Sequence, residues 1–188
     1  MRYLFSIVAA GVFALMAFVA NPIATTFADS VDTALYGTND TLVISSLGIN
    51  APVNTRNVGS DGTMGDPLGK DDVVRYDFPS FPGLGGYPGN GGTAVIAGHV
   101  DYHPNFEAVF WTLRQATAGT RIDYYRYDGT VISYQVDWTG TVGGDDYIGQ
   151  YMVSTSPESM VLITCDGTFD PVTRHYNNRN MVHAVRIS

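Results

Sequence analysis

The strongest constraint on the fold is a succession of short apolar runs separated by glycine, proline and aspartate. Three of these runs are TLVISSLGI (41–49), TAVIAGHV (93–100) and SMVLITC (159–165), and NMVHAVRI (180–187) closes the chain. About eight strand-like runs follow one another, and only one helical pattern lies among them. Successive strands without alternating helices predict a mostly antiparallel sheet that closes into a barrel or folds into a sandwich.

Two local patterns add detail to this prediction. Strand-like runs flank the pair Asp128-Gly129, which favours the positive φ angles of a type I′ turn and predicts a β-hairpin. Between Phe106 and Leu113, apolar residues recur at positions i, i+3, i+4 and i+7. This spacing predicts one short amphipathic helix over residues 105–115.

The amino terminus predicts export of the chain. Residues 3–20 are 18 residues without a charge, and Arg2 precedes them. A signal-peptide core usually has about 7–15 apolar residues and a spanning helix about 20, so we expect an uncleaved signal anchor, with a cleaved signal peptide as the alternative. Either way the remainder is expected on the outer side of the cell membrane. The predicted division is a leader (1–28), a polar linker (29–40) and one globular domain (41–188).

Composition narrows the range of partners. The formal net charge is −8, and Lys70 is the only lysine. Nucleic acid is excluded as a partner, because phosphate binding needs a concentrated positive surface. The four histidines are dispersed without metal-ligand spacing. No cofactor is therefore expected; the acidic loops leave Ca²⁺ open, although they lack EF-hand spacing.

Cys165 is the only cysteine, and it ends an apolar run just before Asp166-Gly167. Exported proteins usually keep cysteines in pairs, so a single one is either a small buried hydrophobe or a reactive thiol. A side chain at a strand end faces the rim of a domain, which favours the reactive thiol. An attacking thiol must ionise beside a positive group or a base.

Histidine and arginine residues could supply that group. His99 ends the buried run AVIAGH, and a rigid strand would hold its ring at the rim as an acid or base. Arg179 directly precedes the last strand-like run, whereas Arg174 lies within the preceding loop. We favour Arg179 for contact with a transient oxyanion, because neighbouring backbone would hold it steady. Arg174 is the alternative.

Three segments of the chain resemble the sortases, the cysteine transpeptidases of Gram-positive-type cell surfaces. VLITC resembles the TLxTC signature of that family, AVIAGHVD resembles the segment that ends in its histidine, and RNMVHAV resembles the arginine with its closing strand. The order is the same, and the likeness runs from about residue 41 to 187. GHVD and ITCDGTFDPVTRHY look most like the class E and F branches.

The resemblance implies a closed eight-stranded β-barrel with one or two short helices, behind an amino-terminal hydrophobic helix. Cys165 would attack a carbonyl within an LPxTG-like sorting motif and form a thioester. His99 would act as acid and base, and Arg179 would stabilise the oxyanion. Thr164 and Asp101 would help to bind substrate, although Asp101 could instead touch His99 or cap a loop. The partners would be proteins with sorting signals and an amine of the cell wall or of a pilin.

Two other functions stay open. In the first, the chain is a non-catalytic surface module that buries Cys165 as a hydrophobe. In the second, it is a cysteine hydrolase that passes the acyl group to water rather than to an amine.

Overall fold

The computed structural model describes residues 36–101 and 106–188. Eight strands and three short 3₁₀ helices make up this part of the chain. In chain order they are β1 (Tyr36–Ile44), η2 (Ser45–Leu47), β2 (Ile49–Asn57), β3 (Val73–Asp77), β4 (Thr93–Gly98), η3 (Leu113–Gln115), β5 (Arg121–Tyr125), β6 (Val131–Gly143), η4 (Gly149–Tyr151), β7 (Ser159–Asp170) and β8 (His175–Arg186).

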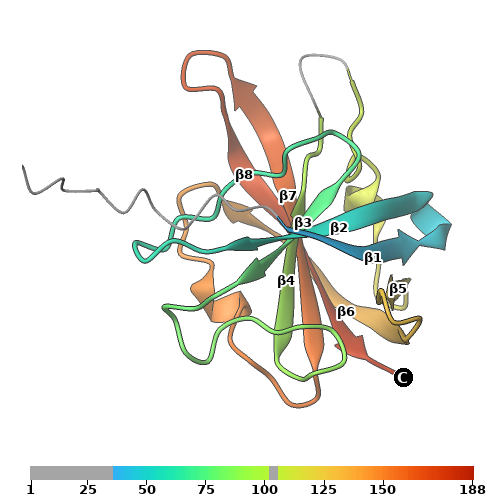
Figure 1. The fold of residues 1–188 in the computed structure, drawn as a ribbon. Helices are drawn as coiled ribbons and strands as arrows, with labels where there is room; N and C mark the ends of the chain where they lie inside the picture. The colour runs from blue at the N-terminus through green and yellow to red at the C-terminus, as the bar shows by residue number, and fades with distance from the viewer. Residues whose placement is uncertain (1–35, 102–105) are drawn as a thin grey trace, which may run out of the picture.

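The strands form a closed barrel in the order β1-β2-β3-β4-β7-β8-β6-β5 (Figure 1). The pairs β2–β3 and β4–β7 are parallel and the other pairs are antiparallel. Hydrogen bonding therefore continues around the barrel without an open edge. The predicted closed, mostly antiparallel barrel of eight strands is confirmed. The β7–β8 hairpin extends beyond the barrel at the top of Figure 1.

Apolar side chains are buried on both faces of one part of the barrel wall. The interior holds residues such as Leu42, Ile96 and Leu162, which are fully buried. A second cluster, which includes Val95 and Val161, lies on the outer face of β3, β4, β7 and β8. Strands buried on both faces read as continuous apolar runs, which is why 93–100 and 159–165 lack alternation.

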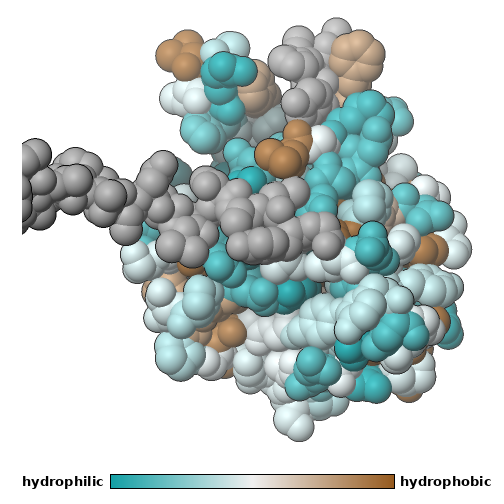
Figure 2. All heavy atoms as spheres, viewed as in Figure 1, coloured by the Kyte–Doolittle hydropathy of each residue, from teal (hydrophilic) through white to brown (hydrophobic). Residues whose placement is uncertain are grey.

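The outer surface is mostly polar, as Figure 2 shows for one face. Apolar side chains also reach the surface at the tip of the β7–β8 hairpin, where Val172 is 88% exposed. Phe106, on the segment that follows β4, is also largely exposed.

The helix predicted over residues 105–115 is wrong for most of its length. Only η3 is helical within the described part of that segment. The backbone N–H of Val109 donates to the carbonyl oxygen of Lys70, and that of Phe110 donates to the carbonyl oxygen of His99. These hydrogen bonds to the loop before β3 and to the residue after β4 replace the i to i−4 bonds of a helix, so the apolar spacing reflects packing of a turn.

The turn of the predicted hairpin also differs from expectation. The N–H of Gly129 donates to the carbonyl oxygen of Arg126, and only Gly129 of the central pair has a positive φ, at 84°. A type I′ turn needs positive φ at both central residues. The hairpin between β5 and β6 therefore turns through Tyr127 and Asp128, with Gly129 in the left-handed position that follows.

The predicted leader (1–28) lies outside the described residues. In the described ranges, no helix is long and apolar enough to cross a membrane. Strand β1 begins at Tyr36, so residues 36–40 belong to the barrel rather than to the predicted linker.

Asp40 anchors the described start of β1 in the barrel. Its carboxylate is 1% exposed and accepts hydrogen bonds from the hydroxyls of Tyr87 and Tyr124 at 2.9 and 2.8 Å. The backbone N–H of Tyr127 donates to its other oxygen at 2.8 Å. A buried carboxylate is tolerated because several donors replace its water. Asp40 therefore ties the start of the barrel to β5 and to the loop before β4.

We expect Asp40→Ala to lower the free energy of unfolding by about 3 kcal/mol, because two buried hydroxyls and one N–H lose a charged acceptor. Urea denaturation of the full chain measures the change. Asp71→Ala is the matched control: its carboxylate is 76% exposed, and such surface changes usually stay within about 0.5 kcal/mol. Equal losses in the two variants would contradict this role of Asp40.

Candidate active site

Strand register brings the three predicted catalytic residues onto one level of the barrel wall. In the parallel pair β4–β7, Ala97 lies opposite Ile163, so His99 and Cys165 each come two residues later. In the antiparallel pair β7–β8, Cys165 lies opposite Arg179. Residues two apart on a strand share a face. His99, Cys165 and Arg179 therefore lie next to one another, on the end of β4, on β7 and on β8.

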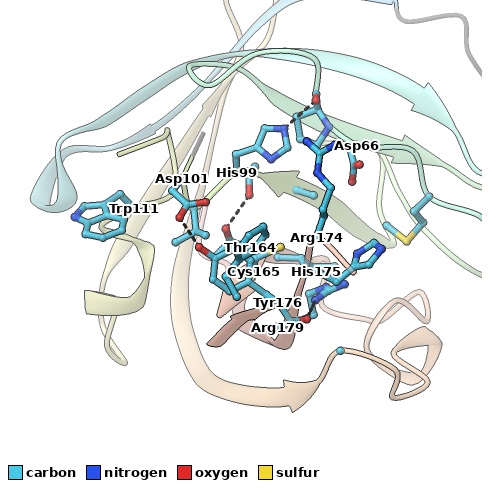
Figure 3. Close-up of a pocket in the computed structure, with 18 of the residues that line it drawn as sticks. Asp66, His99, Asp101, Trp111, Thr164, Cys165, Arg174, His175, Tyr176 and Arg179 are labelled. Atoms are coloured by element: carbon cyan, nitrogen blue, oxygen red, sulfur yellow. Dashed lines mark hydrogen bonds between the residues drawn. The ribbon is translucent and has the colours of Figure 1, made fainter. Parts of the chain in front are cut away.

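These residues line one open hollow of about 1320 Å³ on the outer face of the barrel wall (Figure 3). Its apolar lining includes Met64, Tyr76, Ala97, Ile148 and Ile163. The residues that follow β4 and the β7–β8 hairpin supply further walls. The sulfur of Cys165 is thus open to a ligand and is not sealed in the core.

Burial has the largest effect on the pKa of the Cys165 thiol. Burial raises the pKa of Cys165 above its ordinary value, Arg179 lowers it, and the negative charges of Asp66 and Asp101 raise it further. Burial prevails over the arginine, so the site does not rest as a simple thiolate pair. A thiol of this kind must lose its proton as it attacks.

His99 is held at the end of β4 by its ring. Its Nε2 lies 3.0 Å from the carbonyl oxygen of Pro67. A carbonyl oxygen can only accept, so Nε2 carries a proton in this arrangement. The neighbouring strand is fixed as well, because the Thr164 hydroxyl donates to the carbonyl oxygen of Gly98 at 2.8 Å.

Thr164 was expected to help orient substrate. Its side chain is buried, and its hydroxyl is committed to the end of β4. The structure therefore gives Thr164 a role in holding β4 against β7 beside the thiol.

Both candidate arginines line the hollow, but the surrounding structure holds only one of them in place. Arg179 lies within β8, and its Nη1 donates to the carbonyl oxygens of Tyr176 and Asn178 at 3.2 and 3.1 Å. Among the described residues, no other hydrogen bond of the Arg179 guanidinium is seen. Arg174 is exposed at the hairpin tip with a positive φ of 61°, and in Figure 3 its side chain extends toward the side of Asp66.

Asp101 has a partner that the sequence did not suggest. Its carboxylate accepts a hydrogen bond from the hydroxyl of Tyr176. Tyr176 lies in β8, in a stretch that the sequence presented as a loop. Tyr176 is the last residue of the family-like segment ITCDGTFDPVTRHY, but nothing in the sequence assigned it a role, and no motif included Asp66 or Trp111, which also line the hollow.

The other histidines divide between the hollow and the surface. His175 lines the hollow, whereas His183 binds Asp137 through Nδ1 at 2.6 Å. His103 lies outside the described residues. In the parts of the chain that the structure covers, no group of three or more histidine, cysteine, aspartate or glutamate side chains could hold a metal ion.

Residues 42–187 match the family model described as the sortase domain. Solved structures with a similar fold include a lid mutant of sortase A from Corynebacterium diphtheriae: TM-score 0.58, 20% identity, covering 82% of this chain and 72% of that one. The pilus-related sortase C of Group B Streptococcus has a TM-score of 0.60 and 17% identity, with 81% and 68% covered. A Clostridium perfringens sortase D5 transpeptidase has a TM-score of 0.57 and 17% identity, with 81% and 79% covered.

No curated protein matches this chain. The solved structures named above are of classes A, C and D, and at such identities they show the fold alone. The resemblance to classes E and F stays a prediction.

We expect a methanethiosulfonate reagent to label Cys165 in the folded chain, with a rate that still rises above about pH 8.5, the pKa of a free cysteine. Asp66→Asn should move the midpoint of the rate to lower pH, because it removes a negative charge. Arg179→Ala should move it to higher pH. Asp71→Asn is the control and should leave the profile unchanged. If the labelling rate of the wild-type chain has its midpoint below the pKa of free cysteine, burial does not outweigh Arg179 in setting the pKa of Cys165.

Proposed function

This chain belongs to the sortase family, and we propose that it is an extracytoplasmic cysteine transpeptidase that cleaves an LPxTG-like sorting motif and joins the released acyl group to an amine. The observation that carries the proposal is the alignment of His99, Cys165 and Arg179 across β4, β7 and β8 in one open hollow. These are the residue types that acyl transfer through a thioester requires.

In the first half of the reaction, the thiol proton passes to His99 as the sulfur of Cys165 attacks the scissile carbonyl carbon. Charge develops on the carbonyl oxygen, and the N–H groups of Arg179 that contact no carbonyl stabilise it. The carbon–nitrogen bond then breaks, and His99 donates its proton to the leaving amine. The products are a thioester on Cys165 and a free amine.

In the second half, an incoming amine attacks the thioester carbonyl and loses its proton to His99. The carbon–sulfur bond breaks, and the sulfur leaves as the thiolate or takes the proton back. Each proton transfer in the second half is the reverse of one in the first half, so the imidazole of His99 acts in both halves. The restored state is the protonated thiol that burial favours.

The apolar lining of the hollow supports a peptide substrate with apolar residues. Ala97 and Ile163 lie one step along the strands from His99 and Cys165 on the same face. An extended peptide that runs over them would carry its scissile bond to the sulfur. We propose that the acceptor is an amine of the cell wall or of a pilin, and that the leader (1–28) places the domain outside the membrane.

Incubation of the full chain with LPxTG-like peptides, with and without an amine acceptor, tests this function. We expect cleavage to depend on the acceptor and a thioester to accumulate in its absence. Cys165→Ala should abolish the thioester, and His99→Ala should nearly do so. Tyr127→Phe, an exposed change on the β5–β6 hairpin, is the control. Rapid cleavage that ignores the acceptor would favour the hydrolase alternative.

The two arginines are separated by a second comparison. Arg179→Ala should lower kcat by about 10²–10³-fold, as expected for one oxyanion donor, and leave the thiol accessible to label. Arg174→Ala should lower kcat by less than about fivefold, because an exposed side chain at the tip of the β7–β8 hairpin is not held steadily in place. The reverse result would assign the oxyanion contact to Arg174.

A further inference from the structure

We propose that Tyr176 is a positioning residue: its hydroxyl, through Asp101, holds the segment of His99 against the strand that carries Arg179. The proposal rests on the proposed function for its catalytic consequence, but the bond itself is a feature of the free protein. We call the hydrogen bond between these two side chains the Tyr176–Asp101 link.

The Tyr176–Asp101 link joins β8 to the segment that follows β4, a strand that does not pair with β8. In the barrel order, β7 lies between β4 and β8, and Cys165 is on β7. Asp101 comes two residues after His99, and Tyr176 comes three residues before Arg179. The link, made by residues 75 apart in the chain, therefore spans the nucleophile's own strand. Figure 3 shows it on the side of the hollow where Trp111 lies.

Tyr176 also contacts Arg179 through its backbone. Its carbonyl oxygen accepts a hydrogen bond from Nη1 of the guanidinium at 3.2 Å. Its ring packs against Phe169 of β7, with centroids 5.2 Å apart. One residue thus touches the arginine with its backbone and the histidine segment with its hydroxyl, so a shift of Tyr176 would move both.

The histidine end of the link is a short extended segment. Asp101 pairs with Glu107 in an isolated antiparallel bridge. The N–H of Ala108 donates to the carbonyl oxygen of Val100 at 3.2 Å, and the N–H of Phe110 donates to that of His99 at 3.0 Å. These hydrogen bonds tie residues 99–101 to residues 107–110, so a displacement of Asp101 would also move the backbone of His99.

Proton transfer is sensitive to such a displacement. A general base must stay within hydrogen-bond reach of the proton that it takes, and a misplacement of about 1 Å can cost about a hundredfold in rate. Ground-state binding of the peptide depends on the apolar lining instead. The link should therefore affect kcat far more than KM.

Tyr176→Phe in the full chain is the decisive variant, because it removes only the hydroxyl and keeps the ring against Phe169. We expect kcat to fall about tenfold while KM stays within about twofold. Asp101→Asn should also lower kcat, and the double variant should be no slower than Asp101→Asn alone, as expected of a coupled pair. Tyr127→Phe serves again as the control.

Amide hydrogen exchange of the free variants gives a readout that needs no substrate. In Tyr176→Phe, the amides of Ala108 and Phe110 should exchange faster, while those of β5 stay unchanged. An unaltered kcat, or effects that multiply in the double variant, would overturn the positioning role. If the wild-type chain cleaves no sorting peptide, the proposed function fails, and unaltered exchange at Ala108 and Phe110 would then overturn the link as well.

Discussion

The parallel pairing of β4 with β7 is the constraint on which the site depends. Parallel strands end at the same edge of a sheet, so the residues that follow Ala97 and Ile163 emerge side by side. Pairing of β8 with the same central strand then adds Arg179 opposite Cys165. A slip of one residue in either pair would turn one of these side chains to the other face of the wall.

Two hydrogen bonds stabilise the register of these strands near the place where the strands begin to diverge. The Thr164 hydroxyl reaches the last carbonyl of β4, and Tyr176 reaches Asp101 across β7. A register shift between Asp166 and Phe169 marks where the β7–β8 hairpin departs from the regular ladder. These two bonds therefore hold the strands around Cys165 in place next to an irregular part of the sheet.

The sequence predicted the barrel and its catalytic candidates because their signals are local or familiar. Apolar runs indicated β4, β7 and most of β8, and the sortase-like segments pointed to His99, Cys165 and Arg179. The start of β1 could not be predicted in this way, since Asp40 in a polar stretch looks solvated. The residues that donate hydrogen bonds to it, Tyr87 and Tyr124, lie far along the chain.

Other failures have the same origin. The apolar spacing before Leu113 is satisfied by tertiary packing and by backbone bonds to Lys70 and His99, which no helical pattern reveals. Tyr176 ends a family-like segment that assigns it no role, and its role comes from a carboxylate that folding brings to it. Such pairs are invisible in one sequence because they join distant segments.

The raised pKa of Cys165 has a consequence for the oxidation of its sulfur. Peroxide and other oxidants react with the thiolate, and susceptibility follows thiolate character and exposure. Burial raises the pKa of the Cys165 sulfur and so disfavours its thiolate form. The desolvation that raises this pKa therefore also slows conversion of the sulfur to sulfenic acid.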